Sequence, residues 1–319
     1  MCITQNMKTR LSNSNGFFVS TKLVFELLKH NNKKMSKIKI AIQKSGRLNE
    51  DSVKILKDCG ISIDNGKDQL KAQTRNFPME VMFLRNGDIP QYLRDGIVDI
   101  AIIGENVLIE KGKDISITER LNFSKCKVSL AVPKDFEYNS IKDLDGKRIA
   151  TSYPNTVSEY LDKQGISVEL HQISGSVEIA PNIGLADAIC DIVSSGSTLF
   201  KNNLKEVEVM LTSEAVLAVS PKISNENKRL LEKLQFRIKA VLKARNSKYV
   251  LLNAPNHKIE DIVKILPGMR SPTVLPLAEE GWSSIHTVVE KNKFWDILDE
   301  LKAEGAEGIL VCPIEKMVL

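Results

Sequence analysis

The chain has 319 residues, of which 42% are hydrophobic and 27% charged, a composition that predicts a soluble globular protein of two or three domains. No apolar stretch approaches the roughly 20 residues that a membrane-spanning helix needs, so a membrane protein is not expected. The formal net charge of +5 comes from residues 1–34, which hold six basic and one acidic side chain, whereas the remainder holds 39 of each. This neutral body argues against a nucleic-acid partner.

Residues 1–34 are basic and rich in Asn, Ser and Lys. They fit an organelle transit peptide, a disordered tail or an upstream stretch translated in error. We favour the last, because Met35 stands just before the apolar segment KIKIAIQ (37–43), which is typical of the first strand of a domain. The extension is therefore left out of the fold prediction.

The next segments predict a strand, a short loop and a helix. Strand 37–43 leads into KSGRLN (44–49) and a helix from Glu50 to Cys59, with Asn49 as its N-cap. Lys44 and Arg47 thus lie at the carboxyl end of a strand, where open α/β sheets bind ligands. A basic pair there suits a polyphosphate, although two solvated loop cations are the alternative.

Alternating strands and helices continue along the chain. Strand 79–84, helix 89–94 and strand 98–103 predict a mostly parallel sheet covered by helices. Strand 126–133 is interpreted as a crossing into a second lobe, where Thr156 and Glu159 form a capping box. Segment 206–220 is interpreted as the return to the first lobe. Two α/β lobes joined by two crossings are the type II periplasmic-binding-protein architecture, with the first lobe at 35–128 and 206–244 and the second at 129–205.

The most informative stretch is DAICDIVSSGSTL (187–199). A half-buried strand over 187–193 runs into a small-residue loop, and a helix begins at Leu199. Unpaired N–H groups and the helix dipole make such a loop an anion site, with an ordinary strand-to-helix turn as the alternative. Asp187 and Asp191 are four apart on the strand, hence on one face, where they could hold ribose hydroxyls. The loop residues are Ser194, Ser195, Gly196, Ser197 and Thr198.

Helix 225–245 connects the lobes to a C-terminal domain at 245–319. Its pattern is strand 248–254, helix 258–266, strands 272–277 and 283–289, helix 294–304 and strand 308–314. This βαββαβ order is ferredoxin-like. A domain without a polar constellation of its own is expected to be regulatory or oligomeric.

The five cysteines and four histidines are widely separated. Their spacing indicates no disulfide framework, zinc site or histidine-based triad, and a reducing cytoplasm fits the cysteine usage best.

From Met35 to Leu319 the sequence resembles the ATP phosphoribosyltransferases of histidine biosynthesis, in their long form with a C-terminal regulatory domain. The matching segments are AIQKSGRL (41–48), GIVDIAIIGENVL (96–108), GKRIATSYP (146–154), GSVEIAP (175–181), LADAICDIVSSGSTL (185–199), SKYVLLNAP (247–255) and CPIEKM (312–317).

The resemblance implies transfer of 5-phosphoribosyl from 5-phosphoribosyl 1-diphosphate to N1 of ATP adenine, with release of pyrophosphate and with Mg²⁺ as cofactor. The loop residues 194–198 would hold the 5′-phosphate. The candidates for the catalytic contacts to ribose are Asp187, Asp191 and Glu178, and those for the nucleotide or polyphosphate are Lys44, Arg47, Arg85, Asp99 and Tyr153. Glu178 could instead be a helix N-terminal charge, and Tyr153 a packing residue rather than a stacking platform for adenine. No ligands for the metal are identified.

For the C-terminal domain, the resemblance implies that histidine binds as an inhibitor and shifts a homo-hexamer, with dimers in exchange, toward an inactive arrangement. Ser271 and Thr273 are the candidates for this site, with a Pro-bounded edge strand as the alternative. Three rival functions are a ligand-binding module, the effector-sensing part of a transcription regulator and a phosphoribosyltransferase for another base. The absence of a signal peptide, of a helix-turn-helix and of a basic body favours the enzyme.

Overall fold

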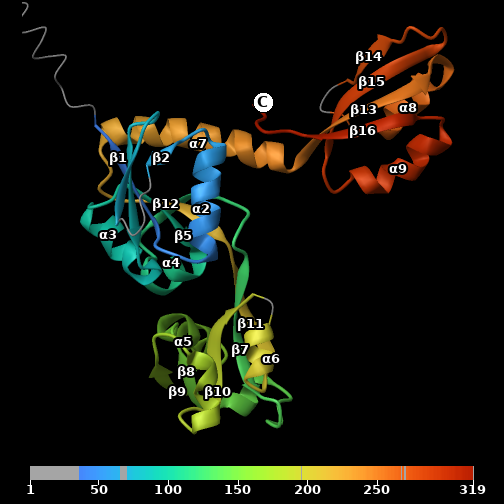
Figure 1. Ribbon diagram of the computed structural model, residues 1–319. Coiled ribbons are helices and arrows are strands. Elements are labelled where there is room, and N and C mark those ends of the chain that lie inside the picture. The colour runs from blue at the N-terminus through green and yellow to red at the C-terminus, as the bar shows by residue number, and fades with distance from the viewer. Residues whose placement is uncertain (1–35, 65–69, 195, 267, 269–270, 319) are drawn as a thin grey trace, which may run out of the picture. The chain divides into compact units, whose positions relative to one another are not determined.

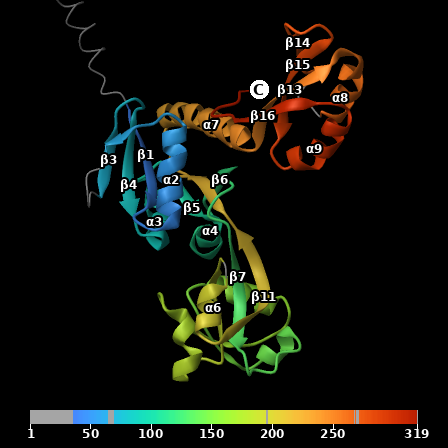
Figure 2. The same ribbon diagram turned by 45° about the vertical axis from the view of Figure 1, so that its right-hand side comes forward.

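The computed structural model describes residues 36–64, 70–194, 196–266, 268 and 271–318, and Lys37–Leu319 form one compact unit. It is an α/β fold with three sheets, shown in two views in Figures 1 and 2.

The first sheet has seven strands in the order β2-β3-β4-β1-β5-β12-β6. Its centre is parallel, because β1 pairs in parallel with both β4 and β5. Alternate residues of β1 enter different cores: Ile40 and Ile42 pack on one face and Ala41 on the other. The strands are β1 (Ile38–Gln43), β2 (Ile63–Asp64), β3 (Lys71–Thr74), β4 (Met79–Leu84), β5 (Ile100–Gly104), β6 (Ser116–Arg120) and β12 (Ala215–Val219).

Helices cover both faces of this sheet (Figure 1). Helices α2 (Arg47–Asp58) and α7 (Asn225–Arg245) contribute to one core, and α3 (Ile89–Asp95) and α4 (Glu105–Lys111) to the other. The predicted start of α2 was wrong, because the helix begins at Arg47 after Gly46, whose φ of 84° suits glycine. Asn49 lies inside the first turn, and its side chain donates to the carbonyl of Gln43.

The second sheet has the order β11-β7-β10-β8-β9. Its elements are β7 (Cys126–Pro133), β8 (Arg148–Thr151), α5 (Pro154–Asp162), β9 (Glu169–Gln172), β10 (Ala188–Val193), α6 (Ser197–Lys201) and β11 (Leu204–Ser213). Strands β7 and β11 pair with each other along their length, so both belong to this lobe. Residues 206–213 therefore do not return to the first sheet as predicted, and the crossings fall after Arg120 and after Ser213 instead.

The predicted capping box at Thr156 and Glu159 was also wrong. Helix α5 begins earlier, at Pro154, and Thr156 donates its N–H and hydroxyl to Glu110 of α4. Glu159 instead pairs with Lys113 and Lys163.

The third sheet has the order β14-β15-β13-β16, with every neighbouring pair antiparallel. This is the ferredoxin-like order predicted from the βαββαβ pattern. Both helices pack on one face, where Val250, Leu252 and Ile285 lie in the core (Figure 1). The elements are β13 (Ser247–Pro255), α8 (Ile259–Ile265), β14 (Thr273–Pro276), β15 (Trp282–Glu290), α9 (Phe294–Ala303) and β16 (Glu307–Pro313).

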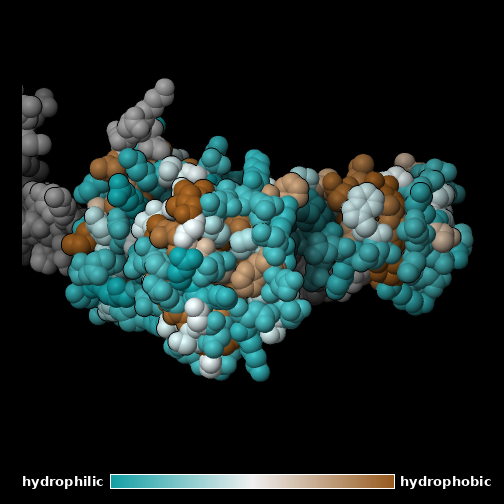
Figure 3. Space-filling model, turned by 90° about the horizontal axis from the view of Figure 1, so that it is seen from below, coloured by the Kyte–Doolittle hydropathy of each residue, from teal (hydrophilic) through white to brown (hydrophobic). Residues whose placement is uncertain are grey.

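The face of the molecule in Figure 3 is mostly hydrophilic, with hydrophobic residues in small groups. Within the described part of the chain, every helix is too short or too polar to cross a membrane.

Candidate active site

The small-residue loop follows β10 directly and ends at the first turn of α6. Gly196 precedes α6 with a φ of 72°, a left-handed conformation that favours glycine. Ser194, Ser197 and Thr198 are exposed beside it, whereas Ser195 lies outside the described residues. The strand, loop and helix predicted from the sequence are therefore present.

A pocket of about 120 Å³ brings this loop together with two carboxylates. Asp191 comes from β10 itself, and Glu178 comes from the 3-10 turn Val177–Ile179. The loop side is lined by Ser194, Gly196, Ser197 and Thr198. Hydroxyl donors for an anion and acceptors for hydroxyl groups thus share one small cavity.

The electrostatics of Asp191 differ from those of an ordinary surface carboxylate. Burial raises its pKa, and the negative charge of Glu178 raises it further. The N–H of Ile192 donates to Asp191 Oδ1 at 2.7 Å and acts in the opposite direction, because it stabilises the ionised form. A bound ligand with hydroxyl donors would likewise stabilise the carboxylate.

Asp187 does not lie in this pocket. It precedes β10, and four residues of strand span roughly 13 Å, so Asp187 sits at the other end of the strand from the loop. Arg148 holds it there through Nη2 at 2.8 Å from Oδ1 and through its backbone N–H at 2.9 Å from Oδ2. These hydrogen bonds lower the pKa of Asp187. Asp187 is therefore not placed to contact the ribose as expected, and its hydrogen bonds with Arg148 stabilise the fold instead.

The first sheet presents three cations at one edge. The N–H of Lys44 donates to the carbonyl of Leu84 at 2.8 Å, which brings the carboxyl ends of β1 and β4 together. Arg85 follows β4, and Arg47 opens α2 with its Nε 3.9 Å from Asp51. All three side chains are exposed. This edge can bind a polyphosphate by charge and hydrogen bonds.

Two other nucleotide candidates lie elsewhere. Asp99 precedes β5, at the opposite edge, and accepts the N–H of Lys39 at 2.7 Å. Tyr153 is only 8% exposed, and its hydroxyl accepts a hydrogen bond from Asn106 at 2.8 Å. Burial raises the pKa of Tyr153. Its ring packs in the core of the second lobe and cannot serve as an open stacking platform for adenine.

A neighbouring hollow of about 380 Å³ shares Val193 and Ser194 with the loop pocket. Arg120 lies in it, bound to Glu105 through Nη1 at 2.7 Å and to Glu214 at 3.5 Å. This cluster was not predicted from the sequence, because Glu105, Arg120 and Glu214 lie at the ends of different strands. The one indication in the sequence is that Glu105 directly follows the predicted strand 98–103 and Gly104, at a strand end where ligands bind in open α/β sheets.

In the C-terminal domain, Ser271 and Thr273 are exposed, and Thr273 opens the edge strand β14 opposite His286. His286 lies 3.0 Å from the Tyr249 hydroxyl and 3.1 Å from the Ser284 hydroxyl. The contacts of His286 with Tyr249 and Ser284 were not predicted, although strand alternation places Ser284 and His286 on one face.

The chain is similar to proteins of one known family. The model of the ATP phosphoribosyltransferase family (HisG) matches residues 85–240, and the model of the HisG C-terminal domain matches residues 244–316. The chain is 56% identical over 281 residues to an ATP phosphoribosyltransferase of Cytophaga hutchinsonii, covering 88% of this chain and 98% of that relative. The chain belongs to the ATP phosphoribosyltransferase family. Because both models match, it is the long form with a C-terminal domain.

Two further family members show the same relationship. An ATP phosphoribosyltransferase of Phocaeicola vulgatus is 52% identical over 282 residues, which cover 88% of this chain and all of that relative. The solved ATP phosphoribosyl transferase (HisG:HisZ) complex from Thermotoga maritima is 32% identical with a TM-score of 0.54. That match covers 63% of this chain and 98% of the solved one.

Proposed function

We propose that the chain transfers 5-phosphoribosyl from 5-phosphoribosyl 1-diphosphate to N1 of ATP adenine and releases pyrophosphate, and that the loop pocket is where the phosphoribosyl group binds. The reaction is that of the family, the first step of histidine biosynthesis. The main support for this site is that Asp191, Glu178 and the loop line one pocket. In this assignment Ser194, Gly196, Ser197 and Thr198 hold the 5′-phosphate.

The displacement at C1′ develops positive charge on the ribose and negative charge on the departing pyrophosphate. Asp191 and Glu178 lie where they can accept from the ribose hydroxyls and stabilise the positive charge. Lys44, Arg47 and Arg85 supply positive charge for the pyrophosphate or the ATP phosphates. The chemistry then needs no protein nucleophile, because positioning and charge stabilisation lower the barrier.

The pocket also fits a requirement for Mg²⁺. Hard divalent cations prefer oxygen ligands and bind substrate phosphates with one or two protein carboxylates, which Asp191 and Glu178 can provide. Among the described residues, no group of three or more acidic, His or Cys side chains could hold a metal ion. Mg²⁺ bound mainly by the diphosphate would neutralise the leaving group.

We assign histidine binding to the C-terminal domain, with Ser271 just before the edge strand β14 and Thr273 on β14 opposite His286 of the neighbouring strand β15. The Thermotoga maritima complex shows a family member assembled with a second protein, HisZ. For this long chain we propose a homo-hexamer, with dimers in exchange, that histidine shifts toward an inactive arrangement. We place the protein in the cytoplasm. Its first lobe would comprise 35–125 and 214–244, its second 126–213, and its regulatory domain 245–319.

The test is pyrophosphate release by the full chain with 5-phosphoribosyl 1-diphosphate and Mg²⁺, with ATP compared against GTP, free adenine and no acceptor. Release that depends on ATP supports the proposal, and suppression by millimolar histidine supports the regulatory assignment. Release with another acceptor in place of ATP would contradict the substrate assignment, and binding without any turnover would favour a ligand-binding module.

A pair of variants on α6 tests the loop. Thr198→Ala should reduce turnover about tenfold or more, because it removes one hydroxyl donor to the phosphate. Lys201→Ala, an exposed position on the same short helix, should stay within about twofold of the parent chain. Equal activity of both variants would remove the loop from the site.

A further inference from the structure

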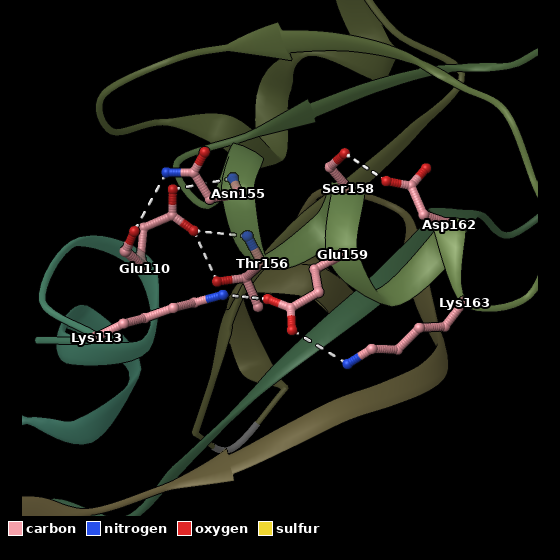
Figure 4. Close-up of polar contacts among 8 residues, drawn as sticks. All are labelled: Glu110, Lys113, Asn155, Thr156, Ser158, Glu159, Asp162 and Lys163. Carbon is pink, nitrogen blue, oxygen red and sulfur yellow. Dashed lines mark hydrogen bonds and ion pairs between the residues drawn. The ribbon is translucent and has the colours of Figure 1, made fainter.

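Glu110 of α4 makes an unusual set of contacts with α5. Its Oε1 accepts the N–H of Asn155 at 3.0 Å, and its Oε2 accepts the N–H of Thr156 at 2.8 Å and the Thr156 hydroxyl at 2.7 Å (Figure 4). The Asn155 side chain also donates to the Glu110 carbonyl at 3.2 Å. Glu110 is only 5% exposed. Helix α4 belongs to the first lobe and α5 to the second, so these hydrogen bonds join the two.

This arrangement replaces a local helix cap. Tyr153 is the N-cap residue of α5, and its side chain makes no capping hydrogen bond with the described residues. The unpaired N–H groups of the first turn therefore receive their acceptor from the other lobe. A buried carboxylate is costly unless it is hydrogen-bonded, whereas here it accepts three hydrogen bonds and faces the positive end of the helix dipole. Glu110 and α5 thus each satisfy a group that the other would leave unpaired.

Two further contacts flank this cap, one from Asn106 of α4 and one from Lys113, just beyond the end of α4. On one side, the Asn106 side chain donates to the buried Tyr153 hydroxyl at 2.8 Å. On the other, exposed Lys113 pairs with Glu159, which also binds Lys163 at 3.1 Å (Figure 4). The exposed pair is expected to add little, because solvent screens it. The buried contacts of Asn106 and Glu110 dominate this junction.

Both helices begin close to the proposed site. Helix α4 starts at the carboxyl end of β5, the strand next to β1, and α5 starts after the carboxyl end of β8, the strand next to β10. We propose that Glu110 is a positioning residue for phosphoribosyl transfer. By capping α5 from α4, it holds the lobe with the loop pocket against the lobe with Lys44, Arg47 and Arg85. This inference rests on the proposed function.

Glu110→Gln tests the cap with almost no change of shape. The amide would point an NH₂ group at one of the backbone or hydroxyl donors, so at least one hydrogen bond is lost. Misplacing two reacting groups by about 1 Å costs up to roughly 100-fold, so kcat should fall about 10- to 100-fold. Ribose 5-phosphate is the probe of the loop pocket alone. Because that pocket lies wholly in the second lobe, its Kd should stay within about twofold.

Glu159→Gln is the matched control, since it removes an exposed carboxylate from α5, the helix that Glu110 caps. Its kcat and its Kd for ribose 5-phosphate should both stay within about twofold of the parent chain. A Glu110→Gln variant with parent-like kcat would overturn the inference. So would a Kd for ribose 5-phosphate that rises as much as kcat falls, because that would indicate local damage to the pocket.

Thr156→Val keeps the test decisive if Glu110→Gln does not fold. It removes only the hydroxyl donor and should lower kcat about threefold, again with little change in the Kd for ribose 5-phosphate. In the double variant the two effects on kcat should be less than multiplicative, because both act on the same hydrogen-bonded cap of Glu110. Fully multiplicative effects, or no effect of Thr156→Val, would contradict the proposal. Turnover by the parent chain, measured first, separates failure of this inference from failure of the proposed function.

Discussion

Asp187 and Asp191 provide a matched pair of substitutions, because they are the same residue type, four positions apart around one strand. Asp191 lines the loop pocket, whereas Asp187 is bound to Arg148 at the other end of β10. We therefore expect Asp191→Asn to affect catalysis and Asp187→Asn to affect stability.

The magnitudes follow from these contacts. Hydrogen bonds to a charged group contribute about 1.5–3 kcal/mol each, and the amide keeps a weaker bond to one ribose hydroxyl, so Asp191→Asn should lose about 3 kcal/mol of transition-state stabilisation. That corresponds to roughly a 100-fold lower kcat/KM. Its Tm should be unchanged or higher, because burial raises the pKa of Asp191 and its ionised form destabilises the free protein at neutral pH.

Asp187→Asn should behave in the opposite way. The Arg148 and Asp187 side chains are 40% and 33% exposed, so solvent screening limits the pair to about 1–2 kcal/mol. This predicts a Tm lower by roughly 2–6 °C with kcat/KM within about threefold. The assays are thermal unfolding and initial rates of pyrophosphate release. A large loss of activity in Asp187→Asn, or near-normal activity in Asp191→Asn, would refute the site assignment.

Three other measurements test separate parts of the site. The kcat/KM should fall on acidification with a midpoint above the ordinary aspartate pKa of about 3.9, since burial raises the pKa of Asp191. Glu178→Gln should move this midpoint to lower pH, because it removes a neighbouring negative charge. A midpoint that Glu178→Gln does not move would show that Glu178 does not influence the ionisation of Asp191. Lys44→Ala should raise the KM for 5-phosphoribosyl 1-diphosphate about tenfold, whereas Lys54→Ala, at an exposed position on α2, should not. Equal KM values for the two variants would exclude Lys44 from binding the diphosphate. Thr273→Ala should weaken histidine inhibition with basal turnover intact; unchanged inhibition would place the effector elsewhere.

Much of the order of elements could be predicted because the longer strands and helices have a strong local signal, whereas the short strands β2, β3, β6 and β9 were not predicted. Alternation identified β10, and the βαββαβ pattern gave the ferredoxin-like domain. The lobe boundaries were less accurate, since β11 carries the same apolar pattern whichever sheet it joins. Only its pairing with β7 decides that membership.

The misplaced site residues share a physical cause. Asp187 and Asp99 both stand just before a strand, whereas the site forms where strands end. Side-chain alternation tells which face a residue occupies but not which end of the sheet it is near. Glu110 was missed for a different reason, because its partners on α5 lie 45 and 46 residues away in the sequence and no local motif joins them.

The position of bound 5-phosphoribosyl 1-diphosphate would show directly whether the loop pocket is the phosphoribosyl site. We would determine a crystal structure of the full chain with this substrate and Mg²⁺. We expect the 5′-phosphate within hydrogen-bonding distance of Gly196, Ser197 and Thr198, with ribose hydroxyls at Asp191. A 5′-phosphate bound at the Lys44 and Arg85 edge, with the loop pocket empty, would contradict it.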